Sequence, residues 1–269
     1  MTAPPPLRDV VQRHGLAARR SLGQHFLLDL NVTEKIVRLA GDLSGRHVVE
    51  VGPGPGGLTR ALLGSGAVGV TAIEVDPRAV AAIEELAATT EGRLRVLAAD
   101  AVGLDVSALV PAPRRIIANL PYNVATPLLI GWLRRAADFE GLTLMFQLEV
   151  AERIVAAPGT GAYGRLAVLA GWVCAVDLQM RLPPTAFVPP PKVWSAVVDF
   201  RPHPVQPEPA LFATMERLTA AAFGQRRKML RGALKGLGGE TLLTRAGIAP
   251  ERRAETLSIT EFDRLARLL

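Results

Sequence analysis

The sequence has very few of the residues that build disulfides or metal sites. Its one cysteine, Cys174, cannot form an intramolecular disulfide, and a cysteine-rich zinc cluster is excluded. The four histidines are scattered without metal-ligand spacing, so we expect no bound metal. Such sparing use of cysteine is typical of a reducing compartment, and we expect a cytoplasmic protein.

Membrane and export signals are also missing from the sequence. The first 24 residues are rich in arginine and lack the apolar stretch of a secretory signal. Residues 116–133 form an uncharged window of membrane-spanning length, but they include two prolines and two asparagines. Those residues would leave polar backbone groups unsatisfied in lipid, so we expect no membrane span.

The composition is that of a globular protein, with 49% hydrophobic and 21% charged residues, which excludes a disordered or collagen-like chain. The length of 269 residues allows one large domain or two modest ones. Residues 1–24 carry a net charge of +3, residues 201–269 carry +5, and the middle carries −2. Basic ends around a near-neutral middle suggest an anionic partner, and a solvated arginine-rich surface is the alternative.

Strands and helices are predicted to alternate from residue 47 onward. The expected strands cover residues 47–51, 68–74, 94–98, 114–118 and 142–148, and helices follow each of the first two and the last two. This alternation predicts a mostly parallel, doubly wound sheet, in which ligands bind beyond the carboxyl ends of the strands. Before the sheet we expect a helix over residues 7–18 and a second helix that begins with a capping box at Asn31.

The pattern changes after Tyr163, where the regular alternation of strands and helices ends. Two further strands are predicted over residues 173–182 and 195–201, on either side of a proline-rich stretch. A second proline run, residues 202–209, has the composition of a semi-rigid linker, and the chain beyond it is predicted to be helical. We therefore expect an α/β domain over residues 1–205, with a basic extension over residues 1–24, and a small helical domain over residues 206–269.

The first strand of the expected sheet runs into a glycine-rich turn. Gly52, Gly54 and Gly57 fit the dinucleotide fingerprint, whereas Gly52, Gly54 and Gly56 fit the pattern of methyl-donor sites. Glu74 ends the next strand, where a carboxylate can accept hydrogen bonds from both ribose hydroxyls of a nucleoside. These residues leave NAD and S-adenosylmethionine both open as ligands.

Two further strand ends carry polar residues. A carboxylate at Asp100 could accept a hydrogen bond from the amine of a bound adenine, although aspartate also begins loops for local reasons. The sequence Asn119-Leu120-Pro121-Tyr122 follows the fourth strand and suits methyl transfer to an adenine amine. The Asn119 amide oxygen and the Leu120 carbonyl can hold both amine hydrogens out of the ring plane, and Tyr122 can stack on a flipped base. Pro121 restricts Leu120 and cannot donate a backbone hydrogen bond.

These motifs together resemble the small-subunit ribosomal RNA adenine N6-dimethyltransferase family, which methylates two adjacent adenosines near the RNA 3′ end. The resemblance runs from about residue 20 to the C-terminus. It rests on the motifs at residues 21–27, 50–56, 119–127, 187–198 and 223–228. It implies a Rossmann-like sheet, S-adenosylmethionine as methyl donor and no metal.

The resemblance also implies roles for single residues. In the family, the residues that correspond to Gln24, His25 and Leu27 close over the methyl donor. The donor contacts are made by positions that correspond here to Gly52, Gly54, Glu74, Asp100 and Asn119. The chain departs from common family usage at His25, Ala125 and Leu148, and none of these departures removes an expected catalytic group.

The C-terminal segment offers a basic stripe. In a helix predicted over residues 226–237, Leu230, Leu234 and Leu237 share one face, while Lys228, Arg231 and Lys235 lie on another. Such a stripe suits phosphate contacts, and a solvated helix face is the alternative. The RNA contacts that we expect are Phe187, Arg226, Arg227, Lys228, Arg231 and Lys235.

The expected function is therefore dimethylation of small-subunit ribosomal RNA, within an assembling small ribosomal subunit, by a monomeric enzyme. A large-subunit RNA methylase of the antibiotic-resistance type is the nearest alternative, because it shares the fold, the donor site and a similar tetrapeptide. A non-catalytic RNA-binding assembly or transcription factor of the same fold is a second alternative. A dinucleotide dehydrogenase is the least favoured, because no hydride-transfer site is evident.

Overall fold

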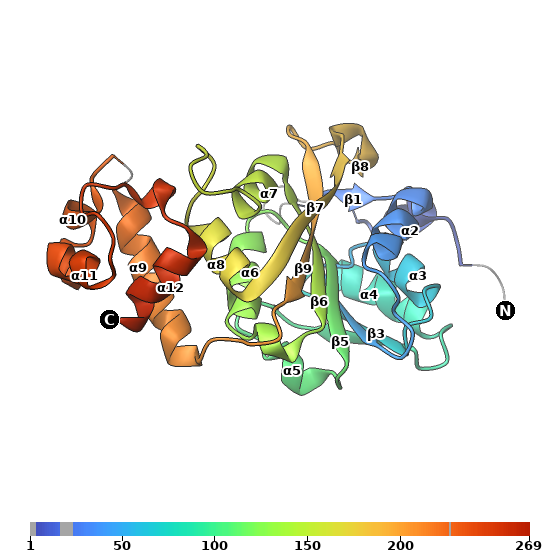
Figure 1. The fold of residues 1–269 in the computed structure, drawn as a ribbon. Coiled ribbons are helices and arrows are strands. Elements are labelled where there is room, and N and C mark those ends of the chain that lie inside the picture. The colour runs from blue at the N-terminus through green and yellow to red at the C-terminus, as the bar shows by residue number, and fades with distance from the viewer. Residues whose placement is uncertain (1–3, 17–23, 226) are drawn as a thin grey trace.

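The computed structural model of the chain describes residues 4–16, 24–225 and 227–269. Within them, seven strands form a sheet in the order β4-β3-β2-β5-β6-β9-β7 (Figure 1). Five neighbouring strands run parallel, and β9 pairs antiparallel with both β6 and β7. The strands are β2 (His47–Val51), β3 (Gly69–Glu74), β4 (Leu94–Ala98), β5 (Arg114–Asn119), β6 (Gly141–Gln147), β7 (Cys174–Leu182) and β9 (Ser195–Pro202). The prediction of a Rossmann-like, doubly wound sheet is confirmed.

Helices cover both faces of this sheet. Almost every residue of the central strands β2 and β6 is buried, and successive side chains point to opposite faces, so both faces must be covered. Val48 packs with residues of α2 and α3, whereas the next residue, Val49, packs with residues of α6 and α8 on the opposite face. Figure 1 shows these two helical layers on either side of the strands. The helices up to the last strand are α1 (Leu7–Arg13), α2 (Leu30–Leu39), α3 (Gly57–Leu63), α4 (Pro77–Ala87), α5 (Val106–Leu109), α6 (Ala125–Leu133), α7 (Leu148–Ile154) and α8 (Arg165–Val173).

The segment before the sheet differs from its prediction in two ways. Helix α1 ends at Arg13, and Gly15 beyond it adopts a φ of 59°, while residues 17 and 18 of the predicted helix lie outside the described residues. Helix α2 begins after Asp29, whose side chain accepts a hydrogen bond from the Asn31 backbone, so the capping box predicted at Asn31 is wrong. An aspartate two residues upstream supplies the same cap.

A two-stranded ribbon was not anticipated. Strand β1 (Phe26–Leu27) pairs antiparallel with β8 (Phe187–Val188), which links the N-terminal segment to the proline-rich stretch.

Helix α8 is not predicted from the sequence, because its residues form an almost continuous apolar run without helical periodicity.

The chain after the linker is helical, but the helix predicted over residues 226–237 is wrong. The helices here are α9 (Pro209–Gly224), α10 (Leu230–Ala233), α11 (Gly239–Arg245) and α12 (Ile259–Arg267). Helix α10 begins only after Met229, whose ψ of 151° is extended, and it is capped at Leu234, beyond which residues 235–237 form a short 3-10 helix. Lys228 therefore precedes the helix, and the three basic residues do not form one helical stripe.

The division into two domains near residue 205 stays a prediction. Helix α9 begins just beyond the proline-rich linker, as expected. The hydrophobic cluster on one sheet face nevertheless continues from Phe200 in β9 to Phe212 in α9 and Phe262 in α12. No helix among the described residues is long and apolar enough to cross a bilayer.

Candidate active site

The carboxyl ends of β2, β3, β4 and β5 surround a cavity of about 290 Å³, called here the strand-end cavity. It collects predicted residues that are as many as 98 positions apart in the sequence. Those that line it are Gln24, His25, Leu27, Gly52, Gly54, Glu74, Asp100, Asn119, Leu120, Pro121 and Tyr122. Every residue predicted to bind the donor or to act in catalysis thus lines one cavity. Their individual roles stay predictions.

The glycine turn on the cavity floor has no space for side chains at two positions. Gly52 adopts a φ of 71°, and a Cβ there would lie 3.3 Å from the Pro121 ring. A Cβ on Gly54, at φ 54°, would lie 2.9 Å from the ring of Phe26. Glycine is required because the turn is left-handed and because Pro121 and Phe26 pack directly on its backbone.

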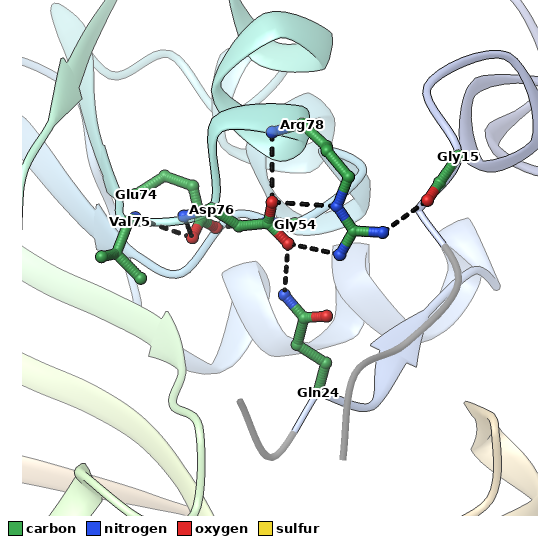
Figure 2. A network of polar contacts seen from close by, with 7 residues as sticks. All are labelled: Gly15, Gln24, Gly54, Glu74, Val75, Asp76 and Arg78. Carbon is green, nitrogen blue, oxygen red and sulfur yellow. Dashed lines mark hydrogen bonds and ion pairs between the residues drawn. The ribbon is translucent and has the colours of Figure 1, made fainter. Parts of the chain in front are cut away.

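Glu74 ends β3 and is almost fully buried. Its carboxylate accepts hydrogen bonds from the backbone of Val75 (2.8 Å), Asp76 (2.9 Å) and Gly54 (3.3 Å), as Figure 2 shows. Burial raises the pKa of Glu74, and the three backbone donors oppose that rise. These bonds fix the carboxylate at the edge of the glycine turn, where it can still accept hydrogen bonds from a ligand.

Glu50 is a cavity residue that our sequence analysis did not assign. Its carboxylate is 1% exposed and accepts a hydrogen bond of 2.7 Å from the Thr59 hydroxyl. Burial raises the pKa of Glu50 to about 8, against the Thr59 bond, and the negative charge of Glu74 raises it further. A carboxylate within a buried strand, one residue before its glycine turn, is a signal that could have identified it.

The N-terminal segment is attached to this edge of the cavity through Asp76. The Asp76 carboxylate accepts hydrogen bonds from Gln24 Nε2 (3.2 Å) and from Arg78 Nη2 (2.6 Å). Arg78 also donates to the Gly15 carbonyl, so one network holds both ends of the stretch between Gly15 and Gln24 (Figure 2). The Arg78 contacts hold the pKa of Asp76 low, at about 2, so the network stays ionised at neutral pH.

The tetrapeptide after β5 presents two free acceptors to the cavity. Asn119 uses its amide nitrogen to donate to the His25 carbonyl, at 3.2 Å. Its amide oxygen and the Leu120 carbonyl accept no hydrogen bond from the described part of the chain. These are the two groups that the sequence predicted would hold the hydrogens of a reacting amine.

Tyr122 is held in place beside the tetrapeptide by neighbours on two sides. Its hydroxyl forms a 2.6 Å hydrogen bond with Ser195 Oγ, and its ring lies 5.5 Å from the His25 ring at an angle of 31°. His25 in turn donates to the Pro189 carbonyl at 2.8 Å. Burial raises the pKa of Tyr122, so the hydroxyl remains protonated and the ring is neutral at physiological pH.

Asp100 differs from the other cavity carboxylates because it is exposed. Its Oδ1 accepts a hydrogen bond from the Val102 backbone at 2.9 Å, which leaves Oδ2 available to a ligand. No group of three histidine, cysteine, aspartate or glutamate side chains within the described residues could hold a metal ion.

The predicted RNA contacts lie in two unlike environments. Phe187 is 2% exposed and pairs with Leu27 across the β1–β8 ribbon, so this placement does not support an RNA contact by its ring. Arg226 lies outside the described residues. The other four predicted contacts are exposed and are called here the C-terminal basic cluster: Arg227, Lys228, Arg231 and Lys235.

The fold and the cavity define a Rossmann-like methyltransferase. A family model described as ribosomal RNA adenine dimethylase matches residues 15–269. The chain is 62% identical over 264 residues to ribosomal RNA small subunit methyltransferase A of Gluconobacter oxydans (strain 621H), which covers 98% of this chain and 87% of that protein. It is 57% identical to the protein of that name from Rhodospirillum rubrum, over 98% of this chain and 92% of the relative. The chain therefore belongs to the ribosomal RNA adenine dimethylase family.

Two solved structures resemble the whole molecule. A dimethyladenosine transferase from Plasmodium falciparum superposes with a TM-score of 0.75 at 26% identity, over 90% of this chain and 96% of that one. The 23S rRNA methyltransferase ErmE superposes with a TM-score of 0.68, also at 26% identity, over 91% of this chain and 99% of that one.

Proposed function

We propose that this protein transfers methyl groups from S-adenosylmethionine to the N6 atoms of adenosines in small-subunit ribosomal RNA, twice per base. The observation that carries the proposal is the pair of free acceptors, Asn119 Oδ1 and the Leu120 carbonyl, on residues that line the strand-end cavity together with Glu74 and Asp100. The relatives at 57–62% identity that bear a small-subunit name support this choice of RNA.

The donor occupies the strand-end cavity. Glu74 accepts hydrogen bonds from the ribose hydroxyls, Asp100 accepts from the adenine amine, and the turn at Gly52 and Gly54 lies against the amino acid portion. Gln24, His25 and Leu27 cover the donor from the N-terminal side. Glu50 is close enough to the glycine turn to share in holding the donor's ammonium group, which would lower the pKa of its carboxyl from about 8.

Transfer is a direct displacement at the methyl carbon. The adenine amine is a poor nucleophile because its lone pair is delocalised into the ring. Asn119 and Leu120 accept its two hydrogens and favour the pyramidal nitrogen, while Tyr122 stacks on the flipped base. The nitrogen lone pair forms the new bond, the carbon–sulfur bond breaks, and the surplus proton leaves to water. Orientation therefore supplies most of the catalysis.

The RNA is also bound by contacts outside the strand-end cavity. The C-terminal basic cluster supplies phosphate contacts, which give affinity without sequence information. We further propose that the protein acts as a cytoplasmic monomer on an assembling small subunit. The names of its relatives support only the small subunit as the substrate.

The large-subunit activity is the second candidate, because ErmE shares the fold over 91% of this chain. The test is to incubate the protein and labelled S-adenosylmethionine with both ribosomal subunits from a strain that lacks the methylase, and then to map the modified bases. Two dimethylated adenosines near the 3′ end of the small-subunit RNA are expected. Label confined to the large subunit, or absent from both, would overturn the proposal.

A further inference from the structure

One aromatic side chain is exposed at the rim of the molecule. Trp194 is 48% exposed and is the one aromatic among the large exposed hydrophobic side chains of the described residues. It belongs to the connection between β8 and β9, where Val193 is also exposed (44%), and Val188 at the end of β8 is 50% exposed. Aromatic residues make up only 5% of the sequence, and the chain otherwise buries most of their surface. An exposed tryptophan is therefore unusual in this chain, and it offers a flat apolar surface on which a ligand ring can stack.

The backbone around Trp194 is firmly held. Its carbonyl accepts a 2.8 Å hydrogen bond from the backbone of Leu148, at the start of α7. The next residue, Ser195, pairs with Gln147 in β6 and bonds to the Tyr122 hydroxyl through its side chain. A rigid support of this kind lowers the entropic cost of stacking on a ligand.

Trp194 lies at the same edge of the sheet as the strand-end cavity. Strand β9 runs antiparallel to β6, so its first residues lie at the carboxyl end of β6. Because consecutive Cα atoms are about 3.8 Å apart, the Trp194 Cα lies within about 9 Å of the Tyr122 hydroxyl. Figure 1 shows α7 and β8, which flank this connection, at one end of the sheet.

Charge near Trp194 suits a nucleic acid. Lys192, two residues earlier, is exposed and forms no ion pair with the described residues. Proteins recognise unpaired RNA by stacking bases on aromatic rings and by pairing the phosphates with nearby cations. A tryptophan beside an unpaired lysine supplies both groups.

We propose that Trp194 is a stacking surface for the unpaired base next to the adenosine that enters the strand-end cavity. The inference rests on the proposed function and deepens it, because it assigns a second nucleotide position to the same site. Stacking of this neighbour on Trp194, with its phosphate near Lys192, holds the strand splayed so that the target base turns toward Tyr122. The selectivity for unpaired RNA then depends on Trp194 as well as on the cavity.

The first test compares Trp194→Ala and Trp194→Phe in steady-state methylation of small subunits that lack the modification. Loss of one stacked base costs about five- to one-hundred-fold in affinity, so Trp194→Ala should raise KM by that factor, while kcat changes less. Trp194→Phe should keep most of the affinity. Val68→Ala is the matched control, because Val68 is 52% exposed at the opposite end of the strands. A KM for Trp194→Ala within twofold of the wild type overturns the inference.

The second test reads the contact directly. Binding of a short single-stranded RNA with two adjacent adenosines should quench tryptophan fluorescence in the wild type and in Trp172→Phe, but not in Trp194→Phe. Trp172 serves as control because its indole already donates to Asp263, at 3.0 Å. Quenching that survives in Trp194→Phe rejects the contact. If Trp194→Ala instead changes the sedimentation of the free protein, the side chain covers a second copy and the inference is also rejected.

The two proposals can fail separately. If the wild type does not methylate small subunits, the proposed function fails, and the quenching experiment still decides whether Trp194 touches RNA. If the wild type methylates normally and Trp194→Ala does so with the same KM, only the stacking inference fails. Calorimetric affinity for S-adenosylmethionine should be equal in all of these variants, since Trp194 does not line the strand-end cavity.

Discussion

The strand-end cavity and the C-terminal basic cluster use charge in opposite ways. In the cavity, Glu50 and Glu74 are buried, and every bond they make to the protein fixes their position. In the basic cluster the cations are exposed, and Arg231 alone forms an ion pair with the described residues, a long one of 3.8 Å to Glu251. This difference is what the proposed function requires: a cavity that carries out the reaction must place atoms precisely, whereas a cluster that binds RNA only has to attract phosphates.

The largest effect is expected inside the cavity. Asn119→Ala removes an acceptor that acts most strongly on the pyramidal nitrogen, so the loss should fall on turnover. We expect the activation free energy to rise by roughly 3 kcal/mol, which lowers the single-turnover rate more than a hundredfold, while RNA affinity changes little. Asn31→Ala, at an exposed asparagine of α2, is the amide control. Near-normal turnover by Asn119→Ala would contradict the mechanism even if the choice of RNA stood.

Tyr122 provides a graded test of the same region. Tyr122→Ala should lose most activity, because no ring remains to stack on the flipped base, a contact worth about 1–3 kcal/mol. Tyr122→Phe keeps the ring and loses only the bond to Ser195, so its single-turnover rate should stay within a few-fold of the wild type. Equal loss in both variants would mean that the hydroxyl, and not the ring, is what the reaction needs.

Glu74→Ala tests donor binding. A lost hydrogen bond to a charged group is worth about 1.5–3 kcal/mol, or one to two decades in affinity for S-adenosylmethionine measured by calorimetry. Glu84→Ala is the matched control, since Glu84 is an exposed glutamate on α4. Unchanged donor affinity in Glu74→Ala would remove Glu74 from the donor site, and binding of NADH would reopen the dehydrogenase alternative.

A pH experiment tests whether burial of Glu50 lowers the free energy of unfolding as the pH rises. Its pKa is about 8 in the folded protein against 4.5 in the unfolded chain, so the unfolded state releases its proton first as pH rises. The contribution of Glu50 to stability is full below pH 4.5 and is lost progressively up to about pH 8. The donor-free Glu50→Gln variant should therefore show a flatter decline in unfolding free energy between these values. If the unfolding free energies of the variant and the wild type change equally with pH over this range, the raised pKa of Glu50 is refuted.

The smallest effect per residue is expected in the C-terminal basic cluster. Reversing the charge of Lys228, Arg231 and Lys235 together should weaken RNA binding, and each lost phosphate contact should lower the salt slope by about 0.7–0.9. Donor affinity should not change. Arg95→Glu, at an exposed arginine of β4, controls for net charge. If affinity and slope both survive the triple reversal, the cluster is only a solvated surface.

The parts of the molecule that could be predicted from the sequence are those fixed by local rules. Strand ends and the glycine turn follow from apolar runs and glycine spacing, so the cavity residues could be grouped before the fold was known. The β1–β8 ribbon could not be predicted, because it pairs two residues near position 26 with two near position 187. Sequence spacing carries no signal for so short and distant a pair.

The C-terminal error has a different physical cause. Basic and leucine residues three and four apart predicted a continuous helix, but the backbone is extended at Met229 and the helix that follows is capped at Leu234, in a segment whose glycines at 232 and 236 lower helix propensity. Glu50 was missed because it was treated as part of a strand. Its pKa is raised by burial and by the charge of Glu74, against the Thr59 hydrogen bond, and only the folded chain brings these groups together.

The β1–β8 ribbon links the strand-end cavity to the connection that carries Trp194. On one side, the Phe26 ring packs on Gly54 and Leu27 lines the strand-end cavity. On the other side, the chain leaves Val188 toward Pro189, which accepts the His25 hydrogen bond, and then reaches Trp194. Because the two strands are paired, we expect a ligand that shifts one of them to shift the other as well. Whatever factor the methyl donor applies to RNA affinity, RNA must apply to donor affinity in return.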